Sequence, residues 1–239
     1  MILALREAAA LGPFFTLALP GEAAAEADWH PFTQLGAPAG VALLADQISR
    51  LGEFLATDEE RAVASILHLG AASAICAPLL ATAALAGTIP SLEPGQLRFG
   101  FQGNGPLRLA LDSLPPDAPR ALLPALADAL IGVVLDGLLA SFTIALTKAV
   151  AVPENTLQGN VFSALAAAAR LVTPASAGAR ARALADLVSR RYLPLHDAGT
   201  LDWRAVDSPD PQSYFRRRNC CLFYRVSGGG ICGDCILTP

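Results

Sequence analysis

Four of the five cysteines lie together near the C-terminal end, in an arrangement that can hold a metal centre. They follow the pattern C-C-x10-C-x2-C, an adjacent pair followed by a C-x-x-C. Four thiolates suit either one structural zinc ion, bound tetrahedrally, or a [2Fe-2S] cluster, in which each iron takes two cysteines. Adjacent side chains tend to diverge, so the pair favours two irons over one ion without deciding the matter. The predicted ligands are Cys220, Cys221, Cys232 and Cys235.

The segment around these cysteines has other features that suit an iron–sulfur cluster. Three consecutive glycines, Gly228 to Gly230, allow backbone N–H groups to approach bridging sulfides closely and so tune the reduction potential. The neighbouring Phe223 and Tyr224 can shield one face of the cluster from water. Arginines add positive charge that partly offsets the charge of thiolate ligands; they are Arg216, Arg217, Arg218 and Arg225.

Few residues elsewhere suggest chemistry. Cys76 lies in an apolar stretch and is interpreted as a small core residue. His68, in the same stretch, is predicted to be a hydrogen-bonded core histidine. The segment GFQGNG is not a dinucleotide-binding motif, because the glycine spacing and the strand–helix context are missing. Disulfides among the cysteines are disfavoured in a reducing compartment.

The composition indicates an intracellular globular protein. Hydrophobic residues make up 53% of the chain and charged residues only 16%, and the net charge of −4 argues against a general nucleic-acid binder. The N-terminal run MILALREAAALGPFF has no basic region and is interrupted by Arg6 and Glu7, so we predict no secretory signal. Cysteines gathered at one end also differ from a secreted disulfide framework. We therefore expect a cytoplasmic location.

The first half of the chain predicts a mixture of helix and strand. Apolar residues at helical spacing predict an amphipathic helix over 39–56. The short run PFFTLALPG, residues 13–21, predicts a strand. Alternating leucines and phenylalanines on both sides of a GNG turn predict a β-hairpin over 95–113.

An apolar segment, residues 62–92, contains no Asp, Glu, Lys or Arg. Its length permits a transmembrane helix. Its high alanine content and its polar residues instead favour a buried core helix, capped by Asp58 and kinked or split at Pro78. Peripheral membrane contact by this segment is left open.

The second half of the chain predicts helices, followed by the cysteine-rich tail. The run PPDAP, residues 115–119, is the predicted boundary between two lobes. The expected fold class is α+β and predominantly helical, with a small antiparallel sheet in the N-terminal lobe. The predicted helices cover 121–150, 155–172 and 179–193, the last stopped by Pro194, and 207–213 is predicted to be a loop. The predicted domains are an α+β lobe over 1–115, a helical lobe over 120–206 and a cluster-binding tail over 207–239.

The tail resembles the FhuF-type siderophore-iron reductase family. The likeness is carried by the C-C-x10-C-x2-C pattern, by the arginine-rich lead and by the sequence GGGICGDC. A second segment, LQGNVFSALAAAARL over 157–171, resembles the Trp-Gly-Asn-rich helix start of that family, with Gln158 in place of the tryptophan. The family is in turn related to the C-terminal region of aerobactin-type siderophore synthetases, which is α+β and largely helical.

The resemblance implies a cytoplasmic [2Fe-2S] protein, with the four cysteines as ligands, that reduces ferric iron held by a siderophore. Siderophores bind Fe(III) through hard anionic oxygens and hold Fe(II) far more weakly, so one electron is enough to release the metal. Positive charge can attract an anionic ferric siderophore, or an acidic electron donor such as a ferredoxin or flavodoxin. The candidate docking residues are Arg216, Arg217, Arg218, Arg225, His196 and Trp203.

Two other functions use the same residues. One is a non-catalytic [2Fe-2S] protein for electron transfer or iron sensing, and a chelate-sized pocket beside the cluster would favour the reductase over it. The other is a siderophore-binding or synthetase-like module stabilised by zinc, which contains no iron or sulfide. The arginines also have a plainer interpretation, as a solvated basic face.

Overall fold

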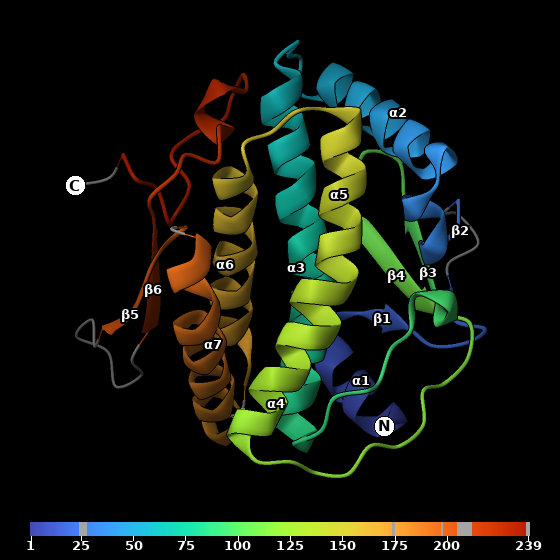
Figure 1. The fold of residues 1–239 in the computed structure, drawn as a ribbon, viewed down its shortest axis with the longest axis vertical. Coiled ribbons are helices and arrows are strands. Elements are labelled where there is room, and N and C mark those ends of the chain that lie inside the picture. The colour runs from blue at the N-terminus through green and yellow to red at the C-terminus, as the bar shows by residue number, and fades with distance from the viewer. Residues whose placement is uncertain (24–27, 174, 197, 205–211, 238–239) are drawn as a thin grey trace.

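The fold is predominantly helical and is arranged around one long helix, α3 (Figure 1). This computed structural model describes residues 1–23, 28–173, 175–196, 198–204 and 212–237. The helices are α1 (Ile2–Ala9), α2 (Pro38–Phe54), α3 (Glu60–Ala86), α4 (Leu123–Leu130), α5 (Ala140–Ala149), α6 (Glu154–Leu171) and α7 (Ala175–His196). The strands are β1 (Leu17–Ala18), β2 (His30–Pro31), β3 (Leu97–Phe101), β4 (Leu107–Leu111), β5 (Gly199–Arg204) and β6 (Gln212–Arg217).

Local signals at both ends define α3. The N-cap residue is Glu59, whose N–H donates to Thr57 Oγ1 at 3.3 Å, so the predicted cap at Asp58 is wrong by one residue. The helix ends at Gly87, which adopts the left-handed conformation (φ 70°) that favours glycine after a helix. Pro78 lies inside the helix and does not divide it in two.

The apolar segment that raised the question of a membrane helix forms the core of the fold. Residues of α3 are mostly buried among α6, α5, α2 and α1, where the alanines allow close helix packing (Figure 1). Two helical stretches, Glu60–Ala86 and Leu123–Ala149, have the length and composition to cross a membrane, but 78% of the most apolar window of the first is buried inside the protein. The predicted buried core helix is therefore confirmed.

A small sheet packs on one side of the helices. Its strand order is β1-β4-β3-β2, and β3 and β4 form the predicted hairpin, with Phe99 opposite Leu109. β1 pairs with β4 in parallel, so the sheet is mixed rather than antiparallel as expected. Only Leu17–Ala18 of the predicted strand over 13–21 pairs with the sheet, because Pro13–Phe15 forms a 3-10 turn.

The helices of the second half differ from the prediction in two details. The stretch from α4 to α5 is continuous, but its middle, Ile131–Leu139, is a π-helix that periodicity did not indicate. The last helix, α7, continues to His196 and so passes Pro194, where the sequence predicted its end.

The hairpin of β5 and β6 was not predicted and carries the chain into the cysteine tail. The two strands pair antiparallel and lie beside α6, on the side of the helices opposite the mixed sheet (Figure 1). Phe215 of β6 is fully buried and contacts the Phe162 ring of α6. Core residues that precede 115–119 and core residues that follow it belong to one hydrophobic cluster. The division into two lobes at that point stays a prediction.

Candidate metal centre

The cysteine tail follows β6 as a compact series of turns. Leu222 adopts a left-handed conformation (φ 67°) directly after the adjacent cysteine pair and starts a 3-10 turn over Phe223–Arg225. Gly228 (φ 71°) reverses the chain, and a Cβ on Gly229 would lie 2.2 Å from the carbonyl oxygen of Phe223. The glycines therefore shape a loop that side chains would obstruct.

These turns bring one thiol of each half of the motif close to the other, and all four cysteines are free thiols in the structure. Cys221 Sγ and Cys232 Sγ, one from each half of the motif, lie 3.4 Å apart. Cys221 and Cys235 are buried, while Cys220 and Cys232 are half-buried. The C-x-x-C is closed by a hydrogen bond from the N–H of Cys235 to the carbonyl of Cys232 (3.1 Å).

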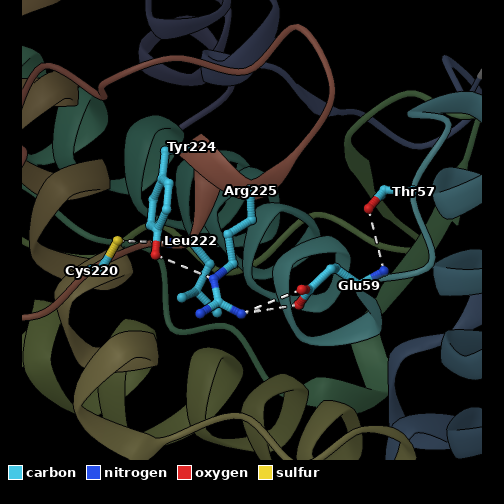
Figure 2. Close-up of polar contacts among 6 residues, drawn as sticks. All are labelled: Thr57, Glu59, Cys220, Leu222, Tyr224 and Arg225. Atoms are coloured by element: carbon cyan, nitrogen blue, oxygen red, sulfur yellow. Dashed lines mark hydrogen bonds and ion pairs between the residues drawn. The ribbon is translucent and has the colours of Figure 1, made fainter.

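Backbone N–H groups point at two of the sulfurs. The N–H of Leu222 donates to Cys220 Sγ at 3.3 Å, as Figure 2 shows, and the N–H of Leu237 donates to Cys235 Sγ at 3.4 Å. Such hydrogen bonds stabilise negative charge on sulfur and are a known means of setting the potential of a cluster. In both halves the donor is the residue two positions after the ligand.

The close sulfur pair also favours a thiolate. The hydrogen bond with Cys232 lowers the pKa of Cys221 to about 6, and the charge of Arg217 acts in the same direction. The same contact raises the pKa of Cys232, so the two sulfurs share one proton before a metal binds. Because the thiolate is the form that binds metal, Cys221 is the readier ligand of this pair.

The donor set has the chemistry that a two-iron cluster needs. Among the described residues, no three His, Cys, Asp or Glu side chains are grouped so as to hold one ion. The sulfurs instead form one close pair, Cys221 and Cys232, with Cys220 and Cys235 each bound to backbone N–H groups. A [2Fe-2S] cluster needs only two thiolates for each iron, and all four soft sulfur donors are present.

The structure corrects one of the predicted docking residues. Arg217 is only 2% exposed, and its guanidinium binds α6 rather than facing solvent. It cannot dock a chelate or a partner protein. Burial lowers the pKa of Arg217, whereas the nearby thiols raise it, and arginine remains charged throughout the usual pH range.

The other arginines of the motif are at the surface. Arg216 and Arg218 are exposed on either side of Arg217. Arg225 forms an ion pair with Glu59 of α3 (3.2 Å) and donates to the hydroxyl of Tyr224 (Figure 2). The Arg225–Glu59 pair ties the loop after the first two cysteines to the start of α3, a contact that the sequence did not predict.

The two remaining docking candidates cannot be placed in the site. His196 is the last residue of α7 and Trp203 belongs to β5, opposite Ser213, but their side chains lie outside the described part of the structure. Sequence reasoning also missed that four residues of α6 contact Arg217, namely Thr156, Gly159, Asn160 and Ser163. The QGN sequence of α6 was noted as part of the resemblance, and two of its residues, Gly159 and Asn160, contact Arg217.

An open groove lies beside the loop that carries the first cysteine pair. Its volume is about 820 Å³, within the usual range for small-molecule sites. One wall is formed by residues 224–227 of the tail and the other by the end of α2 and the start of α3. Glu53, Asp58 and Glu60 line it together with Arg225.

Fold and donor set together define an iron–sulfur protein in which a mainly helical body carries a four-cysteine tail. The family model described as the FhuF 2Fe-2S C-terminal domain matches residues 217–235, from the buried arginine to the last ligand. The tail is thus similar to that domain, and the match indicates a [2Fe-2S] cluster as its cofactor. No curated protein matches the chain. The relation to aerobactin-type synthetases stays a prediction.

Proposed function

We propose that this protein is a cytoplasmic reductase that delivers one electron to siderophore-bound Fe(III) and so releases the metal as Fe(II). The match of the tail to the FhuF 2Fe-2S domain supports a redox role for the four cysteines. When bound, a [2Fe-2S] cluster supplies single electrons. The protein itself needs to hold the ligands near the surface and to dock the ferric chelate beside them.

The groove beside the tail is the observation that carries this proposal. A protein that only passes electrons to another protein needs no cavity next to its cluster, whereas a reductase must hold a bulky chelate there. The groove begins at Tyr224, two residues after the N–H that binds Cys220 Sγ. Substrate in it would therefore lie close to the ligand-bearing loop, which favours the reductase over a simple electron carrier.

The charge of the groove indicates which chelates suit it. Three carboxylates, Glu53, Asp58 and Glu60, line it against one guanidinium, and that of Arg225 is paired with Glu59. This balance repels anions, contrary to the expectation that the arginines attract an anionic siderophore. A neutral or positively charged ferric chelate therefore suits the groove better.

The electron donor is proposed to dock on the outer surface of the tail. Large apolar side chains are exposed there, including Ile231 (61%) and Leu237 (59%). Arg216 and Arg218 precede the first ligands and are also exposed. A small acidic redox protein with an apolar contact area, such as a ferredoxin or flavodoxin, complements this combination.

Reoxidation of the reduced protein by ferric chelates tests the activity. Protein purified and reduced without oxygen is mixed with hydroxamate, catecholate and citrate chelates of different net charge, and the visible and EPR signals of the cluster are followed. We expect at least one chelate to restore the oxidised spectrum, with neutral or cationic chelates reacting faster than anionic ones.

A matched pair of variants tests the groove. Ser49 is exposed on α2 and lines it, whereas Ala42 is exposed two turns earlier on the same helix and does not. Ser49→Trp fills the groove and should slow reoxidation at least several-fold, while Ala42→Trp should not. Failure of every chelate to reoxidise the wild-type protein would remove the reductase assignment and leave electron transfer or iron sensing.

A further inference from the structure

Arg217 is the most extensively hydrogen-bonded buried charge in the described part of the chain. Its Nη1 donates to Ser163 Oγ (3.0 Å), and its Nη2 donates to the Thr156 carbonyl (3.0 Å) and to Asn160 Oδ1 (2.6 Å). All three acceptors belong to α6. A buried guanidinium is stable only when its donors are satisfied in this way, so the position is specific for arginine.

The same residue holds both halves of the cysteine motif. Its Nε donates to the Asn219 carbonyl (3.1 Å), directly before the first cysteine pair. Its backbone N–H donates to the Asp234 carbonyl (3.1 Å), directly before Cys235. One residue thus fixes the chain on either side of the centre to a single helix.

The support continues behind Arg217 into the core. Asn160 Nδ2 donates to the backbone carbonyl and to the hydroxyl of Ser65 in α3, at 2.9 and 3.1 Å. Gly159 leaves the space that the guanidinium occupies, since a Cβ there would lie 2.8 Å from Arg217 Nη2. The sequence Gly159-Asn160 and the tail, remote in sequence, therefore form one unit.

Arg217 also places positive charge behind the sulfurs. It interacts electrostatically with three of the four ligands, Cys220, Cys221 and Cys232, from a position where solvent does not screen it. Reduction adds one negative charge to a cluster that its thiolates already make negative. A buried cation nearby stabilises the reduced form more than the oxidised form and so raises the reduction potential.

We propose that Arg217 is the positioning residue of the metal centre, which anchors both cysteine pairs to α6 and raises the reduction potential of the cluster. The proposal rests on the four cysteines as ligands and not on the siderophore activity. It also gives the Gly-Asn sequence of α6 a role, because Gly159 leaves room for the guanidinium and Asn160 accepts a hydrogen bond from it.

Four variants separate the anchoring from the charge. Arg217→Gln removes the charge and the side-chain hydrogen bonds to Asn219 and α6, and leaves the backbone hydrogen bond to Asp234. Arg217→Lys keeps the charge without the planar guanidinium, and Gly159→Ala keeps the arginine but places a Cβ against its guanidinium. Arg218→Gln is the matched control, because it removes the neighbouring, exposed charge. The readouts are the midpoint potential, from a redox titration followed by EPR, and the half-life of the cluster bands under a chelator; neither involves a ferric siderophore.

We expect Arg217→Gln to move the midpoint potential to more negative values and to shorten the half-life about tenfold or more. Arg217→Lys should have a midpoint potential closer to that of the wild type than Arg217→Gln has, but a shorter half-life of the cluster than the wild type. Gly159→Ala should also shorten the half-life. A potential that moves no further in Arg217→Gln than in Arg218→Gln would overturn the role of the charge. If Arg217→Gln retains no cluster, Arg217→Lys and Gly159→Ala decide, and wild-type half-lives in both would overturn the proposal.

Discussion

His68 is a titratable side chain in the middle of α3 that is completely buried. Its Nε2 lies 2.9 Å from Thr143 Oγ1, while its Nδ1 has no hydrogen-bond partner in the described structure. Burial, and to a lesser degree the charge of Arg217, lower the pKa of His68 to about 3. The residue is thus the core histidine that the sequence predicted, in its neutral form at physiological pH, but only one of its two ring nitrogens is hydrogen-bonded in the described structure.

This burial makes the stability of the protein depend on pH. The folded pKa is depressed, so between pH 6.5 and 3 the unfolded chain binds a proton at His68 that the folded protein does not bind. The free energy of unfolding therefore decreases as the pH falls through this window. Relative to His68→Gln, which does not titrate, the wild type should lose about 2 kcal/mol between pH 7 and pH 5.

Thermal unfolding of both proteins at the two pH values measures this difference. The effects of acid on the cluster and on other groups are common to both and cancel in the comparison. Equal losses of stability in the wild type and in His68→Gln would show that His68 is protonated in the folded state.

At the scale of single residues, a role could be predicted where the spacing in the sequence indicates it, and could not be predicted where only burial in the fold does. The four ligands were predictable, since their spacing is itself the signal and the donor set is complete in one short segment. Arg217 was not, because it stands between two arginines of identical chemistry. Only the strand geometry, in which successive side chains point to opposite faces, buries Arg217 and exposes Arg216 and Arg218.

Among the described elements, α3 contributes the largest share of the core and has a well-defined end. Gly87 follows it with φ 70°, and a Cβ there would meet no atom closer than 3.9 Å. Gly87→Ala should therefore destabilise the protein through backbone strain alone, by about 1 kcal/mol. Gly95→Ala is the control, because Gly95 has no positive φ and open space around it. Denaturant unfolding of both variants checks the expectation, which fails if Gly87→Ala is no less stable than Gly95→Ala.

The elements that periodicity could predict were the long helices and the β3–β4 hairpin, whose turn and alternation are both local signals. The hairpin of β5 and β6 was missed because the residues between its strands are rich in proline and aspartate, which suggested only a loop. The π-helix of Ile131–Leu139 was missed for another reason. Its sequence is apolar except for Asp136 and contains no signal for a change of helical period.

On the scale of the whole molecule, the tail and the body are stabilised by different means. The continuous hydrophobic core extends from Leu5 to Phe215 and includes none of the ligands. Beyond β6 the chain is held by the bonds of Arg217, by the Arg170–Asp234 and Arg225–Glu59 ion pairs, by hydrogen bonds of Arg218 and Asn219 and, when metal is bound, by its thiolates. An exposed ion pair contributes at most about 1 kcal/mol, so the metal and Arg217 dominate.

Removal of the metal should therefore loosen the tail and leave the body folded. We expect chelation under reducing conditions to abolish the visible bands of the cluster while far-UV circular dichroism, which reports the helices, changes little. Arg218 and Arg225 lie within the loosened segment and are sites for trypsin. The metal-free protein should be cut there several-fold faster than the loaded protein, and hydrogen exchange over 218–237 should rise with exchange in α3 unchanged. Loss of the helical signal together with the cluster would mean instead that tail and body fold as one cooperative unit, because the core alone would then be too weak to hold α3 against α6.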